Sequence, residues 1–132
     1  MTIADARARL TDKAIRLQYG ETLIALADER RDFVVLTADL MHATGMEGFG
    51  AAFPDRIINL GIAEQNMAGV AAGLALCGRL PIVCGYAAFT ALRAVEQAKL
   101  DLAYNGVKAI LTGQSGGLSY GVGGPTHQSF ED

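Results

Sequence analysis

Short apolar runs alternate along the chain with longer segments in which apolar side chains recur every three or four positions. The runs are rich in β-branched residues and bounded by charged residues, glycine or proline, which predicts buried strands. We expect four strands, at residues 33–37, 56–60, 82–85 and 107–112. The periodic segments predict helices over residues 64–77 and 87–104, and residues 4–30 predict one helix, or two with a break near Gly20. Alternating strands and helices predict a three-layer α/β domain, with a mainly parallel sheet and helices on both faces.

Two glycine-containing segments interrupt this alternation. Residues 38–55 have no clean period and predict a loop with room for one short helical turn. Residues 113–124 hold six glycines among twelve residues and lead into the sequence Pro-Thr-His-Gln at 125–128. The chain ends at Asp132, directly after this loop. We therefore expect residues 1–132 to form one domain that is cut short after Asp132.

Composition narrows the classes of function. Hydrophobic residues make up 51% of the chain and charged residues 19%, which suggests that a partner covers part of an apolar surface. The net charge is −3 and basic residues do not cluster, so we expect no nucleic-acid partner. No apolar stretch is long enough to span a membrane, and residues 1–10 lack the apolar core of a secretory signal. Cys77 and Cys84 form no CxxC pair, so we expect a reducing, cytoplasmic location.

Glu64 is the first candidate for chemistry. It follows a turn at Gly61, where the strand predicted at 56–60 passes into a helix. A carboxylate at this position is stabilised by the positive end of the helix dipole. Open parallel sheets also bind their ligands at the carboxyl ends of strands. From the residues alone, a structural role at the start of the helix is favoured over a catalytic one.

Three further side chains follow later strands. Tyr86 and Phe89 stand three positions apart, and could either pack in the core or form an aromatic wall for a flat ring. His127, after the glycine-rich segment, is a candidate general acid or base. The sequence contains no phosphate-loop motif, no GxSxG and no metal-ligand spacing, so we expect no metal site in this chain.

Three segments together resemble the pyrimidine-binding domain of transketolase-like enzymes. They are residues 59–73 (NLGIAEQNMAGVAAG), residues 86–97, and residues 124–132 (GPTHQSFED). The sequence is most similar to the separate C-terminal subunit of split transketolases. Deoxyxylulose-phosphate synthase and the β subunits of 2-oxo-acid dehydrogenases are more distant relatives. The resemblance extends from about Arg16 to Asp132.

The resemblance implies thiamine diphosphate as the cofactor. Glu64 matches the family glutamate that hydrogen-bonds the aminopyrimidine ring and promotes loss of the proton from the thiazolium carbon. A partly desolvated carboxyl group suits this role, because it holds its proton more readily than in water. Tyr86 and Phe89 match the aromatic residues against which the ring packs. Asp39 and Leu40 match a segment that approaches the cofactor from the second chain.

The same resemblance assigns residues to the substrate. His127 matches a histidine that lines the substrate channel, and Arg16 falls where transketolases carry an arginine for the substrate phosphate. Two positions depart from the family: Ser115 stands in place of a histidine, and Gly123 in place of an aspartate. Both positions contact the substrate in the family. The departures leave the cofactor chemistry intact but put a sugar-phosphate substrate in doubt.

The family motif that binds the diphosphate and Mg²⁺ is absent from these 132 residues. The resemblance therefore implies that a diphosphate-binding subunit or domain holds the Mg²⁺, and that this chain supplies half of a site. It also implies a homodimer of pyrimidine-binding domains.

The expected reaction transfers a two-carbon ketol unit from a ketose, phosphorylated or not, to an aldehyde. Two alternatives remain open: a related thiamine-diphosphate enzyme acting on a 2-oxo acid, and a non-catalytic assembly module.

Overall fold

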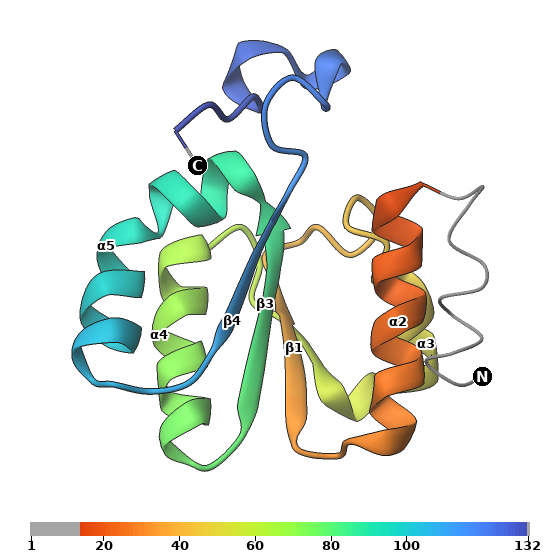
Figure 1. Ribbon diagram of the computed structural model, residues 1–132, viewed down its shortest axis with the longest axis vertical. Helices are drawn as coiled ribbons and strands as arrows, with labels where there is room; N and C mark the ends of the chain where they lie inside the picture. Colours follow the sequence, from red (N-terminus) through yellow and green to blue (C-terminus); the bar gives the residue numbers. More distant parts are fainter. Residues whose placement is uncertain (1–13, 132) are drawn as a thin grey trace.

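The computed structural model describes residues 14–131, which contain one four-stranded parallel sheet (Figure 1). The strands lie in the order β2-β1-β3-β4. Their bounds are β1 (Phe33–Thr37), β2 (Ile57–Asn59), β3 (Leu80–Tyr86) and β4 (Ile110–Gln114). The predicted three-layer α/β fold is confirmed.

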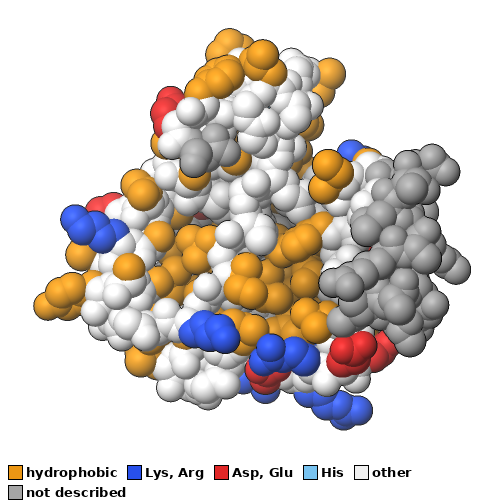
Figure 2. Space-filling view, viewed as in Figure 1, with side chains coloured by type: hydrophobic (Ala, Val, Ile, Leu, Met, Phe, Trp, Pro, Cys, Tyr) orange, Lys and Arg blue, Asp and Glu red, His pale blue; other side chains and the backbone are white. Residues whose placement is uncertain are grey.

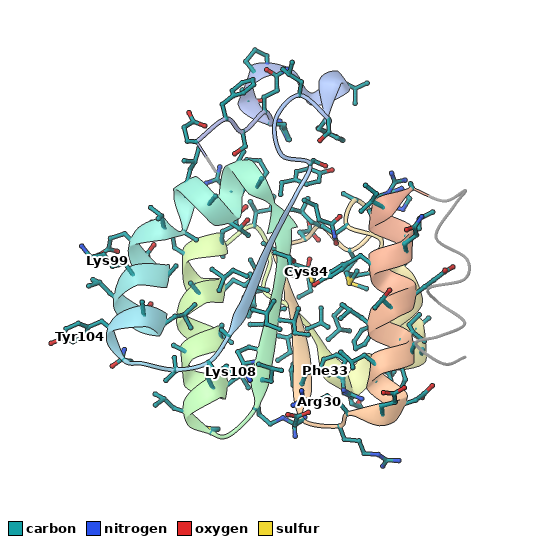
Figure 3. All side chains as sticks on the ribbon, viewed as in Figure 1. Arg30, Phe33, Cys84, Lys99, Tyr104 and Lys108 are labelled. Carbon is teal, nitrogen blue, oxygen red and sulfur yellow. The ribbon has the colours of Figure 1, made fainter. Side chains whose placement is uncertain are left out.

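Helices cover both faces of the sheet. On one face lie α2 (Ile15–Glu29) and the short α3 (Glu47–Ala52), and on the other α4 (Glu64–Leu76) and the helical segment 88–104 (Figure 1). Alternate residues of β1 serve the two layers: Phe33 and Val35 pack toward α2, and Val34 and Leu36 toward α4. Figure 3 shows the side chains of Phe33 and Cys84 between the sheet and α2. All five residues of β1 are buried, as a central strand requires.

The strand order creates a switch point beside β1. From β1 the chain passes to β2 on one side and later to β3 on the other. Thr37, the last residue of β1, lies in register with Cys84 of β3 and Asn59 of β2. The carboxyl ends of these strands therefore share one edge, where open α/β sheets form their ligand crevices.

Of the two alternatives predicted for residues 4–30, the one with a break near Gly20 is wrong, because α2 is continuous from Ile15 to Glu29. Gly20 serves packing instead: a Cβ there would lie 2.2 Å from the carbonyl oxygen of Gly45. The glycine thus lets the loop before α3 approach the helix backbone. The part of the predicted helix at residues 4–13 lies outside the described residues.

The helix predicted at 87–104 is one helical segment with uneven pitch. It comprises the π-helical η2 (Ala88–Arg93), the α-helical turn α5 (Val95–Gln97) and the π-helical η3 (Ala98–Tyr104). The wide turn shows in a hydrogen bond of 3.1 Å from the Ala94 N–H to the Phe89 carbonyl, five residues earlier.

Strand boundaries also differ from the prediction. Strand β4 starts at Ile110 rather than 107, because Val107 and Ala109 pack against the α4-side core from the preceding loop. It extends to Gln114, since Gly113 allows close approach: a Cβ there would lie 2.8 Å from the Cα of Ala87. No helix among residues 14–131 is both long and apolar enough to cross a membrane.

Candidate functional site

Glu64 is the first residue of α4 and is 2% exposed. The turn before it needs Gly61, whose φ is +71°. The Gly61 N–H donates to Oδ1 of Asn59 over 3.1 Å, which ties the turn to the end of β2. The helix start therefore places a carboxylate inside the protein, at the edge where the strands end.

Arg93 is the partner of this carboxylate. Its Nη1 donates to Oε2 of Glu64 over 2.9 Å. The two side chains differ in environment, because Arg93 is 49% exposed and Glu64 is 2% exposed. The guanidinium also lies over the ring of Phe89, 4.8 Å from its centroid, at a distance typical of a cation–π contact. A buried carboxylate is thus linked through one arginine to an aromatic side chain.

Phe89 belongs to an aromatic cluster of four side chains. Phe89, Tyr86 and His127 were predicted site residues, and Tyr120 was not. Tyr86 lies 6.0 Å from Phe89 and 4.9 Å from Tyr120, measured between ring centroids. The imidazole of His127 stands edge-on to Phe89 at 5.3 Å and to Tyr86 at 6.0 Å. The tail of the chain after β4 lies beyond the carboxyl ends of the strands in Figure 1. Its residues Tyr120 and His127 contact Tyr86 at the end of β3.

Burial changes the acidity of Tyr86, which is 3% exposed. Loss of solvation, with a smaller contribution from the Tyr120 hydroxyl, raises the pKa of Tyr86 to about 12. Tyr86 therefore stays a neutral phenol well above physiological pH, and its burial suits it to packing.

The conformation of the tail depends on Gly123. A Cβ at this position would lie 2.4 Å from Cδ1 of Tyr120 and 2.8 Å from Cβ of His127. An aspartate, as the family resemblance leads one to expect, does not fit while Tyr120 keeps this position. His127 is further held by Thr126, whose Oγ1 lies 2.9 Å from Nδ1.

Two cavities of about 580 Å³ each adjoin the cluster. One is lined by Phe89, Arg93 and tail residues including Thr126 and Glu131. The other lies between the start of α2 and the end of β4, and is lined by residues including Arg16, Ser115 and Tyr120. Arg16 and Ser115, which the resemblance places on the substrate, therefore share one cavity.

Asp39 and Leu40 lie apart from these contacts, just after β1. The Asp39 N–H donates to Oδ1 of Asn59 over 2.9 Å, and Nδ2 of Asn59 donates back to the Asp39 carboxylate over 3.2 Å. These bonds hold Asp39 at a φ of +61°, which is costly for a residue other than glycine. Asp39 is exposed, so its carboxylate is open to approach from outside the chain.

Sequence reasoning missed three side chains that shape the site: Arg93, Tyr120 and Asn59. Arg93 lies within a segment that carries the family resemblance, but its pairing with Glu64 depends on the pitch of η2. Tyr120 lies in a glycine-rich stretch without periodicity, so no pattern indicated its contact. Asn59 had a detectable signal, because an asparagine directly before a glycine turn often bonds the backbone N–H two residues later.

The residues present fit the aminopyrimidine part of thiamine diphosphate. Phe89 lines a cavity as a flat apolar surface, and Arg93, which lines the same cavity, binds the buried carboxylate of Glu64. Within residues 14–131 there is no group of three or more His, Cys, Asp or Glu that could hold a metal ion.

Comparison with known proteins agrees with this geometry. Residues 11–132 match the family described as transketolase, pyrimidine binding domain. An apulose-4-phosphate transketolase subunit from Phocaeicola vulgatus is 40% identical over 119 residues, which are 90% of this chain and 38% of that protein. The 6-deoxy-6-sulfo-D-fructose transketolase subunit SqwH from Clostridium sp. (strain MSTE9) is 37% identical over 124 residues, 94% of this chain and 38% of that protein. The chain thus spans well under half the length of these relatives.

Solved structures share both fold and sequence with the chain. A split-gene transketolase, described as an inactive beta4 tetramer, superposes with a TM-score of 0.71 at 39% identity. That match covers 86% of this chain and 35% of the other. Transketolase from Campylobacter jejuni gives a TM-score of 0.76 at 28% identity over 89% of this chain and 19% of the other. Because residues 11–132 match the model of this family over most of the chain, and the fold and the sequence agree with solved transketolases, the chain belongs to the family of transketolase pyrimidine-binding domains.

Proposed function

We propose that the chain forms the pyrimidine-binding half of an active site in a thiamine-diphosphate-dependent, transketolase-like enzyme. The observation that carries this proposal is Glu64, a 2%-exposed carboxylate at the start of α4, joined through Arg93 to the ring of Phe89. The relatives that are described as transketolase subunits support it.

Each side chain has a distinct task in this proposal. Glu64 binds a ring nitrogen of the aminopyrimidine and shares its proton. Phe89 holds the ring by stacking, and Tyr86, packed against Phe89, helps to exclude water from it. His127 handles protons at the substrate, and Asp39 with Leu40 meets the cofactor of the second chain. Thiamine diphosphate, when bound, supplies a thiazolium carbon that stabilises negative charge on the substrate.

The remaining parts of the site come from other polypeptide segments. A diphosphate-binding subunit or domain holds the diphosphate and its Mg²⁺. Two pyrimidine-binding domains pair as a homodimer, in line with the tetramer described for a split transketolase of similar structure. The location is the cytoplasm.

The reaction is transfer of a two-carbon ketol unit from a ketose to an aldehyde within carbohydrate metabolism. Gly123 and Ser115 depart from the usual transketolase residues, which favours a substrate other than the common sugar phosphates. A second candidate is a deoxyxylulose-phosphate-synthase-like reaction on a 2-oxo acid. It is favoured by a 40% identity over 114 residues to 1-deoxy-D-xylulose-5-phosphate synthase 2 of Kitasatospora griseola.

The decisive experiment reconstitutes the chain with a diphosphate-binding partner and compares Glu64→Gln with the wild type. We expect both complexes to assemble, and Glu64→Gln to lose about 10²- to 10⁴-fold in turnover, as is typical for loss of a proton-transfer group. Glu47→Gln is the matched control, because Glu47 is an exposed carboxylate whose Oε2 lies 3.0 Å from Nδ1 of His42. Unchanged turnover in Glu64→Gln would refute the assignment.

The products separate the candidate functions. Ketol transfer consumes a ketose without release of CO₂, whereas reaction with a 2-oxo acid releases it. A wild-type complex that assembles but binds no thiamine diphosphate would instead indicate a non-catalytic assembly module.

A further inference from the structure

We propose that Arg93 is a positioning residue that keeps Glu64 ionised and oriented until the aminopyrimidine ring arrives. This inference rests on the proposed function, because it concerns how Glu64 meets that ring. The inference goes beyond the proposed function because it assigns a role to Arg93, which is not among the predicted site residues. Arg93 does not touch the reacting atoms in this proposal, and it acts only through Glu64.

The geometry of the Glu64–Arg93 pair indicates that Arg93 controls the charge of Glu64. Glu64 is almost fully withdrawn from water, and a carboxylate in such a place strongly favours its neutral form unless a cation faces it. Arg93 supplies that cation at 2.9 Å, in a charge-assisted hydrogen bond. An arginine keeps its charge across the whole physiological pH range. Of the titratable side chains in the described part of the chain, His127 contacts Phe89, and Glu131 lines the same cavity as Arg93.

Arg93 is itself held in place. Its guanidinium lies over Phe89, four residues earlier in the same helical turn. The wide turn of η2 is marked by the Ala94-to-Phe89 hydrogen bond, which spans five residues. A π-helical turn of this kind shifts the side chains that follow it and is frequent at functional sites. The ring that would pack against the cofactor therefore also orients the arginine that holds Glu64.

This arrangement has a measurable consequence for the number of protons taken up when thiamine diphosphate binds. If Glu64 is ionised before the ring binds, the proton that the two groups then share must come from solvent. Binding of thiamine diphosphate therefore takes up a proton at neutral pH. Without Arg93, the buried Glu64 already carries that proton, and the uptake on binding is lost.

The test is titration calorimetry of the reconstituted complex with thiamine diphosphate and Mg²⁺, in two buffers of different ionisation enthalpy. We expect proton uptake in the wild type, its loss in Arg93→Met, and its retention in Arg93→Lys, which keeps the charge. Arg93 is half-exposed, so its replacement is compatible with folding. Should Arg93→Met fail to assemble, Arg93→Gln provides a second neutral variant.

A double-mutant cycle shows whether Arg93 acts only through Glu64. In the Glu64→Gln background, Arg93→Met should leave proton uptake unchanged. Equal uptake in the wild type and Arg93→Met would overturn the inference, as would loss of uptake in Arg93→Lys. Failure of the proposed function is distinguishable, because the wild-type complex would then not bind thiamine diphosphate at all.

Discussion

Gly123 governs which side chains the tail can place next to His127. In the structure, the ring of Tyr120 fills the space that any side chain at position 123 would need. Tyr120 in turn packs on Tyr86 and lines the cavity that contains Arg16 and Ser115. A side chain at position 123 is therefore incompatible with the position that Tyr120 has in this structure.

We predict that Gly123→Ala destabilises the chain by about 1–3 kcal/mol, the usual cost of forcing extra atoms into a packed region. The added methyl group must displace Tyr120 from Tyr86. Gly121→Ala is the control, since a Cβ there meets no atom within 4 Å, and it should change stability by less than about 0.5 kcal/mol. Urea denaturation measures both, and equal stability of the two variants would contradict the prediction.

At the scale of secondary-structure elements, two glycines within helices have opposite roles. Gly20 in α2 meets the Gly45 carbonyl oxygen, whereas a Cβ at Gly73 in α4 would meet nothing within 4 Å. Helix propensity alone predicts that alanine stabilises both helices by up to about 1 kcal/mol. Packing reverses this expectation at Gly20, where an added methyl group would clash with the Gly45 carbonyl oxygen.

We expect Gly73→Ala to stabilise the chain by about 0.5–1 kcal/mol and Gly20→Ala to destabilise it by about 1–3 kcal/mol. The reason for the second value is a clash with backbone, which cannot move aside as the end of a flexible side chain can. Thermal unfolding of the two variants gives the sign of each effect. A rise in melting temperature for Gly20→Ala would show that the loop before α3 yields easily.

Elements with a strong local signal were predictable from the sequence. Strand β1 has the predicted bounds, because a run of five buried residues on a central strand needs no tertiary information to detect. Helix α4 also begins at the predicted residue, since Gly61 marks the turn before it. The changes of pitch in residues 88–104 had no such signal, because they depend on how the helix packs against the sheet.

The residues of the candidate site were likewise only partly predictable from the sequence. Glu64, Tyr86 and Phe89 follow predicted strands, so topology alone brings them to one edge of the sheet. The pairing of Glu64 with Arg93 could not be predicted, because it depends on the rotation of one helix relative to another. Tyr120 could not be placed either, since a glycine-rich tail has too many accessible conformations for its contacts to be inferred.

At the scale of the whole molecule, the edge of the sheet at β4 is apolar and open. Within the described part of the chain, β4 pairs only with β3, and Ile110 and Leu111 are 42% and 37% exposed. Figure 2 shows hydrophobic side chains gathered in the middle of the face on which β4 lies in front in Figure 1. An unpaired apolar edge strand is a template for pairing with another chain.

We predict that the isolated chain self-associates with increasing concentration, and that Ile110→Lys reduces this association. A lysine on an edge strand opposes strand pairing through its charge. Leu76→Lys, at the end of α4, is a control at a residue that is 70% exposed and not on β4. Light scattering over a concentration series measures the mass. A strictly monomeric wild type would refute the prediction, and equal effects of the two variants would place the contact elsewhere.

The backbone at Asp39 has a consequence for laboratory evolution of this protein. An aspartate at a φ of +61° carries a conformational cost that glycine would not, so a selection for heat resistance alone would favour Asp39→Gly. That replacement would also remove the carboxylate that Asn59 binds and that faces outward after β1. Under the proposed function, in which Asp39 meets the cofactor of the second chain, such a selection would raise stability at the expense of activity.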